Sequence, residues 1–459
     1  MTETTALDAQ PLDSRILAVL KELVEHHSSS RCVAEKMGQA HNYVARILRG
    51  ETKLRLDVLE RILDALGVSQ SFFLQLVSSN GDPRDLVEVL RFYGADGPPP
   101  EPFIVEIDQR VENLLEGMAL EGASLESSLP SATPTRHETP HRAALVALED
   151  RRQTDRPGAK AELEAMAEQI FSDIEVAGFS RDLGADLAEL LAIWATIQRF
   201  EGCRRDTSLA YQVAIRLALT VDSSRALGIS LQKAAYLLRD LSCNQAALVF
   251  LEHASHAMLR NGDLVACGKI FVDRGLMFLS LAEWPGAVRE LGSALNLLPE
   301  CEWRNRAGAF GNLAICFEQM KDFEKAKYCL EHAEAIYGDS NEMGLAYVCW
   351  NRGNLAMADG DVSMAETYFV RALNRLEDFG QPLDFATLAL SLAEAYMRQS
   401  KVQALRDLAD RMLAWLPAIR GNRIADAALM EWIRCARWGE VTHQVLREAR
   451  QQLQQAAGR

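Results

Sequence analysis

A repeat of 39 residues is the feature that most restricts how this chain can fold. In each copy, three positions hold mainly small residues, and a position between the last two holds a large apolar residue. In chain order, the small positions are Gly275, Ala314, Gly353 and Leu392, then Ala287, Ala326, Ala365 and Ala404, then Ala294, Ala333, Ala372 and Arg411, and the large position is Leu291, Leu330, Phe369 and Leu408. A unit of this length cannot bury its apolar face alone, so neighbouring copies must stack on one another.

Residues from about 142 to the end of the chain have a helical composition almost throughout. They are rich in Ala, Leu, Glu and Arg, and prolines fall only at expected turns such as Pro382. No segment shows the sustained polar–apolar alternation that is typical of a half-buried strand. Short turn-forming groups such as Asp359-Gly360-Asp361 separate two helices in each copy. The sequence therefore predicts an all-α chain.

Helix pairs with small residues at their crossing resemble the tetratricopeptide repeat (TPR) family, with helices longer than in its 34-residue form. The resemblance implies a C-terminal TPR-like α-solenoid, in which the first helix of each pair lines a concave groove. TPR-like repeats are expected over residues 228–422, with frames that start near residues 228, 268, 307, 346 and 385. Residues 142–227 are expected to form degenerate helical units, and residues 423–459 capping helices.

Residues 12–80 show the pattern of a separate, smaller domain. Short helices are expected at residues 14–26, 30–37, 41–49, 56–66 and 70–77. Ala34 is a small residue where two helices can cross, Gly38 suits the turn between them, and Val44 and Ile47 are apolar positions for a core. This pattern resembles the XRE/Cro-type helix-turn-helix family. The resemblance implies an N-terminal five-helix lambda-repressor-like DNA-binding domain.

The same resemblance implies which residues face DNA. In this family the second helix of the motif lies in the major groove, and its N-terminal residues reach base edges. The base-reading positions are then Ala40, His41, Asn42 and Arg46, and the phosphate-contacting positions are Ser30, Arg31, Arg49, Lys53 and Arg55. Asparagine can pair with adenine and arginine with guanine. The family usually has Gln and Glu where this chain has Ser30 and Leu48, so a helix-turn-helix that no longer binds DNA stays open as an alternative.

Charge separates this domain from the rest of the chain. The whole chain has 49 Lys and Arg against 64 Asp and Glu, a formal net charge of −15. From Arg31 to Arg55 there are six basic and two acidic residues, a net charge of +4. An acidic chain repels DNA overall, so DNA binding requires a locally basic module. This charge distribution favours a protein that binds double-stranded DNA at specific sites over one that binds DNA non-specifically.

Proline marks the stretch between the two parts. Nine of the fourteen prolines lie between residues 83 and 157, and residues 81–141 are interpreted as a proline-rich linker with one amphipathic helix at about 103–118. The linker contains His137-Glu138-Thr139-Pro140-His141, which fits the H-E-x-x-H pattern of zinc peptidases. Pro140 breaks the helical turn that would bring the two histidines together, so no metal site is expected. A linker metallopeptidase remains a third, minor hypothesis.

Asparagines fall on the expected groove side of the repeats. By the repeat frame, Asn312, Asn351 and Asn354 lie on first helices, and Arg239 lies on the first helix of an earlier copy. Asparagine is a poor mid-helix residue because its amide competes with the backbone. Inward amides can hydrogen-bond the backbone of an extended peptide. A peptide groove is one interpretation, and side chains that simply face water are the other.

Several classes of function have no support in the sequence. The phosphate-binding loop and the nucleophile-elbow motif are absent, so we expect no enzyme activity, no catalytic residues, no metal and no cofactor. No apolar run approaches the roughly 20 residues of a membrane span, and the first thirteen residues lack the basic start of a signal peptide. We expect a cytoplasmic transcriptional regulator, a homodimer that binds an operator and a peptide or protein effector. The alternative is a TPR scaffold or adaptor with a vestigial helix-turn-helix.

Overall fold

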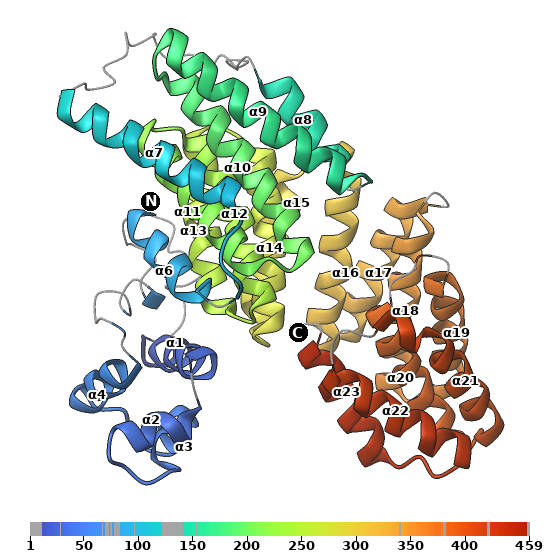
Figure 1. Cartoon of the computed structure of the whole chain (residues 1–459). Helices are drawn as coiled ribbons and strands as arrows, with labels where there is room; N and C mark the ends of the chain where they lie inside the picture. Colours follow the sequence, from blue (N-terminus) through green and yellow to red (C-terminus); the bar gives the residue numbers. More distant parts are fainter. Residues whose placement is uncertain are drawn as a thin grey trace. The chain divides into compact units, whose positions relative to one another are not determined.

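The computed structural model confirms the all-α prediction for the residues that it describes. These are residues 12–27, 29–66, 68, 73, 76–77, 83–95, 97–121, 141–152, 154–338, 341–377, 379, 382–419 and 423–456. Every regular element in these ranges is a helix (Figure 1). Contacts divide the chain into two compact units, Met1–Ile270 and Phe271–Arg459. Among the described helices, none is both long enough and apolar enough to cross a membrane.

The first four helices match the predicted helix-turn-helix. They are α1 (Leu12–His27), α2 (Ser30–Lys36), α3 (Tyr43–Leu48) and α4 (Leu56–Leu66). Val44 and Ile47 are fully buried, as is Ala34 at the predicted crossing. Gly38 has a φ of +66°, which a glycine adopts without strain in the turn after α2. The fifth helix, predicted at 70–77, lies largely outside the described residues.

The segment interpreted as a linker contains more helix than the sequence analysis predicts. The helix expected at 103–118 is α7 (Pro102–Glu121), and before it come the short 3-10 helix η2 (Pro83–Asp85) and the unexpected α6 (Leu86–Tyr93). Three of the buried residues of α6 are Val89, Leu90 and Tyr93. The apolar run of α6 is only eight residues long, and the neighbouring prolines favour a linker. Residues 122–140, with most of the H-E-x-x-H string, lie outside the described residues.

Helices follow one another in pairs through the rest of the chain. The bounds are α8 (Arg142–Arg151), α9 (Arg156–Ala177), α10 (Arg181–Glu201), α11 (Arg204–Thr220), α12 (Ser224–Asp240), α13 (Asn244–Arg260), α14 (Leu264–Ser280), α15 (Trp284–Leu297), η3 (Glu300–Glu302), α16 (Trp303–Gln319), α17 (Phe323–Tyr337), α18 (Glu342–Asp359), α19 (Val362–Glu377), α20 (Pro382–Arg398), α21 (Val402–Ile419), α22 (Arg423–Trp438) and α23 (His443–Ala456). From α8 to α13 and from α15 to α23, each helix packs against the next one in the chain. The predicted helical-repeat solenoid behind a helix-turn-helix is therefore confirmed.

Small residues allow the two helices of a pair to approach closely, as the repeat predicts. A Cβ atom added to Gly353 would lie 2.4 Å from Phe369 Cε1, and one added to Gly275 would lie 2.6 Å from Leu291 Cδ2. Phe369 is 1% exposed and Leu291 is fully buried. In these two copies the large residue thus fills the space that the glycine leaves on the partner helix.

The turn inside each pair repeats the same backbone conformation. Ala282, Lys321, Gly360 and Ser400 follow α14, α16, α18 and α20, and their φ angles are +56°, +61°, +85° and +58°. This left-handed conformation is the usual way to end a helix, because it lets backbone N–H groups reach the last free carbonyls. The repeat is thus visible in the backbone as well as in the side chains.

Candidate DNA-binding site and the repeat groove

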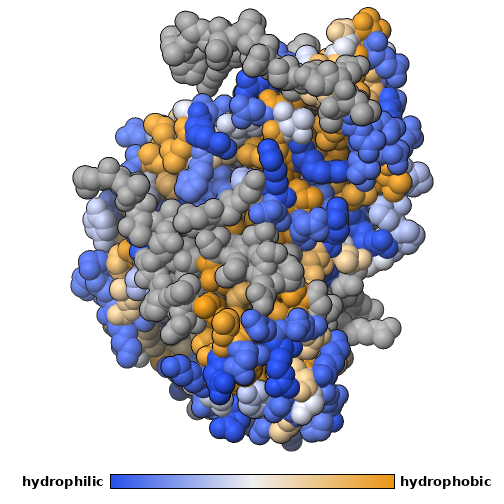
Figure 2. All heavy atoms as spheres, turned by 90° about the vertical axis from the view of Figure 1, so that its left-hand side faces the viewer, coloured by the Kyte–Doolittle hydropathy of each residue, from blue (hydrophilic) through white to orange (hydrophobic). Residues whose placement is uncertain are grey.

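The predicted base-reading residues lie on the surface around the start of α3. Ala40, His41 and Asn42 are exposed in the turn before the helix, and the Arg46 side chain on α3 is 50% exposed. Asn42 occupies the N-cap of α3 without a capping hydrogen bond from its side chain, so its amide is not used in capping the start of the helix. Hydrophilic side chains gather along the lower rim of Figure 2, at the end where α2–α4 lie in Figure 1. The start of α3 therefore exposes short polar groups and one arginine at the surface.

Most of the basic residues of this surface form ion pairs with neighbouring carboxylates. Glu35 Oε1 lies 3.2 Å from both Arg31 Nε and His41 Nδ1. Glu51 accepts from Arg49 at 2.6 Å and lies 3.7 Å from Arg46 Nε, and its hydrogen bond with Arg49 lowers the pKa of the Glu51 carboxyl. These pairs are exposed and weak, and phosphate oxygens can replace the carboxylates.

The remaining phosphate positions are also at the surface. Arg55 Nε donates to Asp57 Oδ1 at 2.9 Å, and Lys53 is exposed. Ser30 is half-buried in the first turn of α2, where the neighbouring Ser29 caps the helix by accepting from the Cys32 N–H at 3.2 Å. The roles of all nine DNA-facing residues remain predictions from the resemblance.

Replacing Glu51 with glutamine tests whether this pairing restrains DNA binding. The variant removes the carboxylate that competes with phosphate for Arg46 and Arg49. We expect affinity for DNA to rise about two- to fivefold at low salt. Fluorescence anisotropy at fixed ionic strength measures the change. Asp64→Asn, the same charge change at an exposed position on α4, is the control, and an equal gain in both variants would show a general charge effect only.

The comparison with known families decides what the first domain is. The helix-turn-helix family matches residues 23–72, which include α2, α3 and α4. The N-terminal domain is an XRE-type helix-turn-helix domain. The resemblance found in the sequence is therefore confirmed.

Among the solved structures that are similar to part or most of this chain are two proteins. One is BtubC (BKLC) from P. vanneervenii, with 20% identity and a TM-score of 0.42 over 48% of this chain and 91% of that chain. The other is yeast Tom70, with 12% identity and a TM-score of 0.38 over 94% of this chain and 83% of that chain. No curated protein is significantly similar to this chain in sequence.

The helix-turn-helix domain is docked on the repeats through a buried carboxylate. Glu22 of α1 accepts the backbone N–H groups of Gln245 and Ala246, at 2.7 Å and 3.1 Å, and a hydrogen bond from the Tyr93 hydroxyl at 3.3 Å. The two N–H groups lie in the first turn of α13, whose own N-cap residue, Cys243, makes no side-chain cap. The first domain thus supplies the cap of a repeat helix.

A histidine extends this junction. His26 Nε2 lies 3.1 Å from Arg204 Nη2, and its ring packs edge-on against Tyr93 with centroids 4.6 Å apart. Arg204 also donates to the backbone carbonyl of Tyr93. The contact joins α1 and α6 to α11 and α13. No local sequence pattern predicts this junction, because the partners lie about 180 to 220 residues apart.

The buried carboxyl makes this junction sensitive to pH. Burial raises the pKa of Glu22 from 4.5 to about 7, so the docked state favours the protonated form. Docking is then strongest below about pH 4.5, weakens as the pH rises towards 7, and is constant above it. We expect hydrogen-exchange protection of the Gln245 and Ala246 amides, corrected for intrinsic exchange, to fall between pH 5 and pH 8.

The Glu22→Gln variant is the control for this prediction. Its amide keeps an acceptor for the two N–H groups but does not titrate, so the change in protection should disappear. A pH dependence that persists in Glu22→Gln would assign the titration to another group.

The structure brings together only part of the predicted peptide groove. Asn312 of α16 and Asn351 and Asn354 of α18 are half-buried on first helices that pack side by side. Arg239 belongs to α12 in the other unit, where its guanidinium lies 5.3 Å from the Tyr236 ring centre and 3.4 Å from Asp240 Oδ1. The role of the asparagines as peptide ligands stays a prediction.

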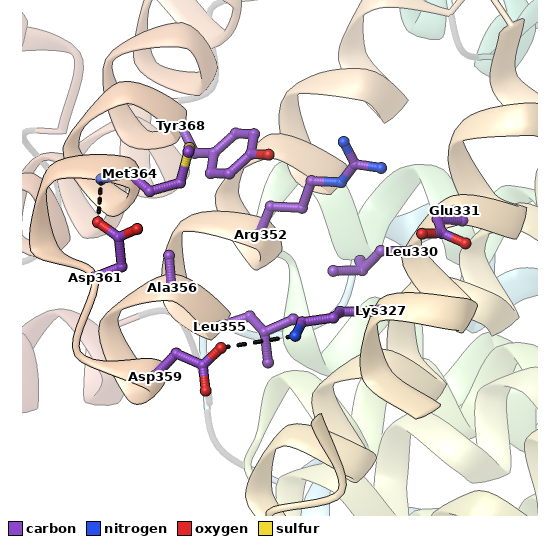
Figure 3. Close-up of a pocket in the computed structure, with 10 residues that line it drawn as sticks. All are labelled: Lys327, Leu330, Glu331, Arg352, Leu355, Ala356, Asp359, Asp361, Met364 and Tyr368. Atoms are coloured by element: carbon purple, nitrogen blue, oxygen red, sulfur yellow. Dashed lines mark hydrogen bonds and ion pairs between the residues drawn. The ribbon is translucent and has the colours of Figure 1, made fainter. Parts of the chain in front are cut away.

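A cavity of about 340 Å³ lies between α17, α18 and α19, and it does not include the asparagines (Figure 3). Its residues are Lys327, Leu330, Glu331, Arg352, Leu355, Ala356, Asp359, Asp361, Met364 and Tyr368. Some of the charges there have partners: Lys327 lies 3.7 Å from Asp359, and Asp361 accepts from the Met364 N–H at 2.9 Å as the cap of α19. These contacts engage Lys327, Asp359 and Asp361 within the protein.

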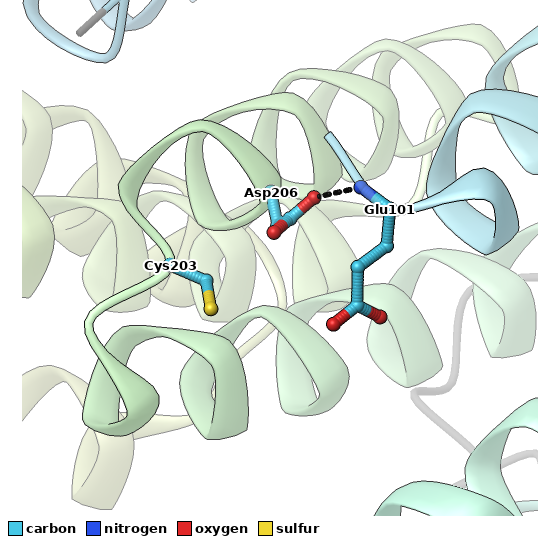
Figure 4. A group of neighbouring side chains, drawn as sticks. All are labelled: Glu101, Cys203 and Asp206. Atoms are coloured by element: carbon cyan, nitrogen blue, oxygen red, sulfur yellow. Dashed lines mark hydrogen bonds between the residues drawn. The ribbon is translucent and has the colours of Figure 1, made fainter. Parts of the chain in front are cut away.

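Glu101, Cys203 and Asp206 form a cluster with metal-ligand chemistry (Figure 4). Asp206 accepts the Glu101 N–H at 2.6 Å, just before α7 begins, and Lys160 Nζ lies 3.0 Å from both carboxylate oxygens of Glu101. Burial raises the pKa of the Cys203 thiol, which disfavours the thiolate that binds metals. These groups hold α7 on α11. From the H-E-x-x-H string only His141 is described, 3.2 Å from Asp173 Oδ2 of α9.

Proposed function

We propose that this protein is a DNA-binding transcriptional regulator. The observation that carries the proposal is the helix-turn-helix domain, with Ala40–Asn42 and Arg46 exposed around the start of α3, the second helix of the motif. One such module buries too little surface for tight specific binding, so the proposal includes a homodimer on two half-sites. It assigns the chain no catalysis and no cofactor.

The proposal gives the repeats the role of binding a peptide or protein effector, or of forming the dimer. The Glu22 junction supports a link between the two parts, since α1 and the first turn of α13 share hydrogen bonds. An effector that prefers one arrangement of α13 therefore also favours one position of α1. Such a change alters the spacing of the two DNA-reading helices in the dimer.

Genomic footprinting, followed by gel shift on the sites found, tests the regulator. We expect a defined site and an affinity that falls steeply with salt, because phosphate contacts release counterions. An absence of DNA binding even at low salt would favour the second candidate, a repeat scaffold with a vestigial helix-turn-helix. The pairing of Arg31, Arg49 and Arg55 with carboxylates is the observation that favours this candidate.

A further inference from the structure

Helix α8 lies across the first helices of two neighbouring repeat pairs. Lys233 Nζ of α12 donates to Glu149 Oε1 of α8 at 2.6 Å, and Arg152, at the end of α8, donates to the same oxygen at 2.8 Å. The Lys233 and Arg152 side chains are 13% and 15% exposed. Helix α8 also packs on α10, which lies beside α12. A single short helix thus contacts two successive first helices.

The contact uses the side of α12 that faces away from its own partner helix. Gly228 marks the side that packs on α13, since a Cβ atom there would lie 2.8 Å from Met258 Cε. Lys233 follows five residues later, about 140° around the helix. On this side Arg199 Nη1 of α10 also reaches Asp240 Oδ2 of α12, at 2.5 Å. This is the groove side that the repeat frame predicts for first helices.

Charge holds Glu149 in this groove in its ionised form. Burial alone raises the pKa of the carboxyl, but hydrogen bonds from Arg152 and Lys233 overcome it and lower the pKa to about 2. Burial lowers the pKa of Lys233 despite the attraction of Glu149. The groove therefore provides a cationic site whose partner is a carboxylate.

Helix α8 fills this site with few contacts. It has ten residues, against 21 in α10 and 17 in α12, and its fully described apolar anchors are Leu145 and Leu148, which are 2% and 4% exposed. Within the described residues, Glu149 Oε2, Arg152 Nε and Arg199 Nε are buried without a hydrogen bond. Of these three atoms only Arg199 Nε belongs to the groove helices, so a ligand that hydrogen-bonds to it gains an interaction that α8 leaves unmade.

We propose that α8 is an internal occupant of the groove formed by α10 and α12, and that the external partner of this groove is an amphipathic helical peptide of the same kind. Its features are two leucines three residues apart and a carboxylate directly after the second, as in Leu145, Leu148 and Glu149. This inference rests on the proposed effector role of the repeats. Because α8 is tethered, its effective concentration is in the ~mM range, and it blocks weaker peptides.

Charge reversal in the full chain tests the proposal. Lys233→Glu repels Glu149 and should open the groove to a fluorescent peptide of residues 141–152 that carries Lys at position 149. The same variant should bind the unmodified peptide about tenfold more weakly or worse. The double variant Glu149→Lys with Lys233→Glu restores the pair inside the chain, and it should again exclude both peptides. Lys233→Glu that binds neither peptide, or both equally, overturns the proposal.

A second variant is a control for the fact that Lys233→Glu changes the groove itself. Leu145→Glu with Leu148→Glu removes the anchors of α8 and leaves α10 and α12 intact, so it should bind the unmodified peptide, which the natural chain excludes. A released α8 can itself unfold, which costs the helicity of ten residues; a larger loss of helicity, measured by circular dichroism, would make α8 a structural helix and overturn the inference. The peptide-binding assay contains no DNA, so its result can be interpreted even if the protein does not bind DNA. The footprinting result in turn does not depend on whether the groove binds a peptide.

Discussion

Arg46→Ala is expected to weaken specific DNA binding about 10–100-fold, or roughly 1–3 kcal/mol, and to relax the preference at one base pair. The reason is geometric: α3 places the Arg46 guanidinium on the exposed side of the helix, where a paired donor can reach the acceptors of a guanine. The half-exposed side chain contributes little to the core formed by Val44 and Ile47. The domain should therefore keep its thermal stability while it loses affinity.

Two matched variants separate base reading from charge. Lys53→Ala should weaken binding to all DNA sequences nearly equally. It should also reduce the salt dependence of the affinity by about one phosphate contact. Lys21→Ala makes the same charge change on α1, away from the predicted surface, and should leave affinity close to that of the natural chain. Gel shifts with the natural site and single-base variants measure all three. Equal losses in Arg46→Ala and Lys21→Ala would remove Arg46 from the reading surface.

The core of the first domain could be predicted from local sequence. Ala34, Gly38, Val44 and Ile47 have roles that depend on neighbours a few residues away, and the structure places each as expected. The same holds for Phe369, whose place in the repeat is set by spacing. Local periodicity is sufficient here because each helix pair contacts mainly itself and its neighbours.

The couplings between parts of the chain could not be predicted in this way. Glu22 reads as an ordinary polar position in α1, and only the fold brings the first turn of α13 to it. Glu149 and Lys233 lie 84 residues apart and belong to no motif. Charged residues carry no periodic signal of their own, so a long-range pair leaves no trace in a single sequence. The repeat frame places Arg239 on a first helix, but a repeat frame does not predict which compact unit a copy belongs to.

Phe369→Ala should destabilise the second unit by about 3–5 kcal/mol, since it removes a fully buried ring and leaves a cavity. Gly353 lies directly opposite the ring, so no larger side chain is present on α18 to fill the space. In a solenoid each helix pair is stabilised mainly by its neighbours. Weaker packing between α18 and α19 should therefore also split the unfolding transition into two steps. Urea titration followed by circular dichroism measures both effects.

Phe369→Leu is the matched control, because Leu291, Leu330 and Leu408 occupy the same position in other copies. A leucine should fit the seam with a loss below about 1.5 kcal/mol and a single transition. If the alanine and leucine variants destabilise the unit equally, the ring does not fill the space between α18 and α19. The expectation that a large residue fills the space opposite a small one would then be wrong for this copy of the repeat. A large difference between the two variants instead shows that the volume at this one position, rather than its apolar character alone, keeps α18 and α19 coupled as one repeat.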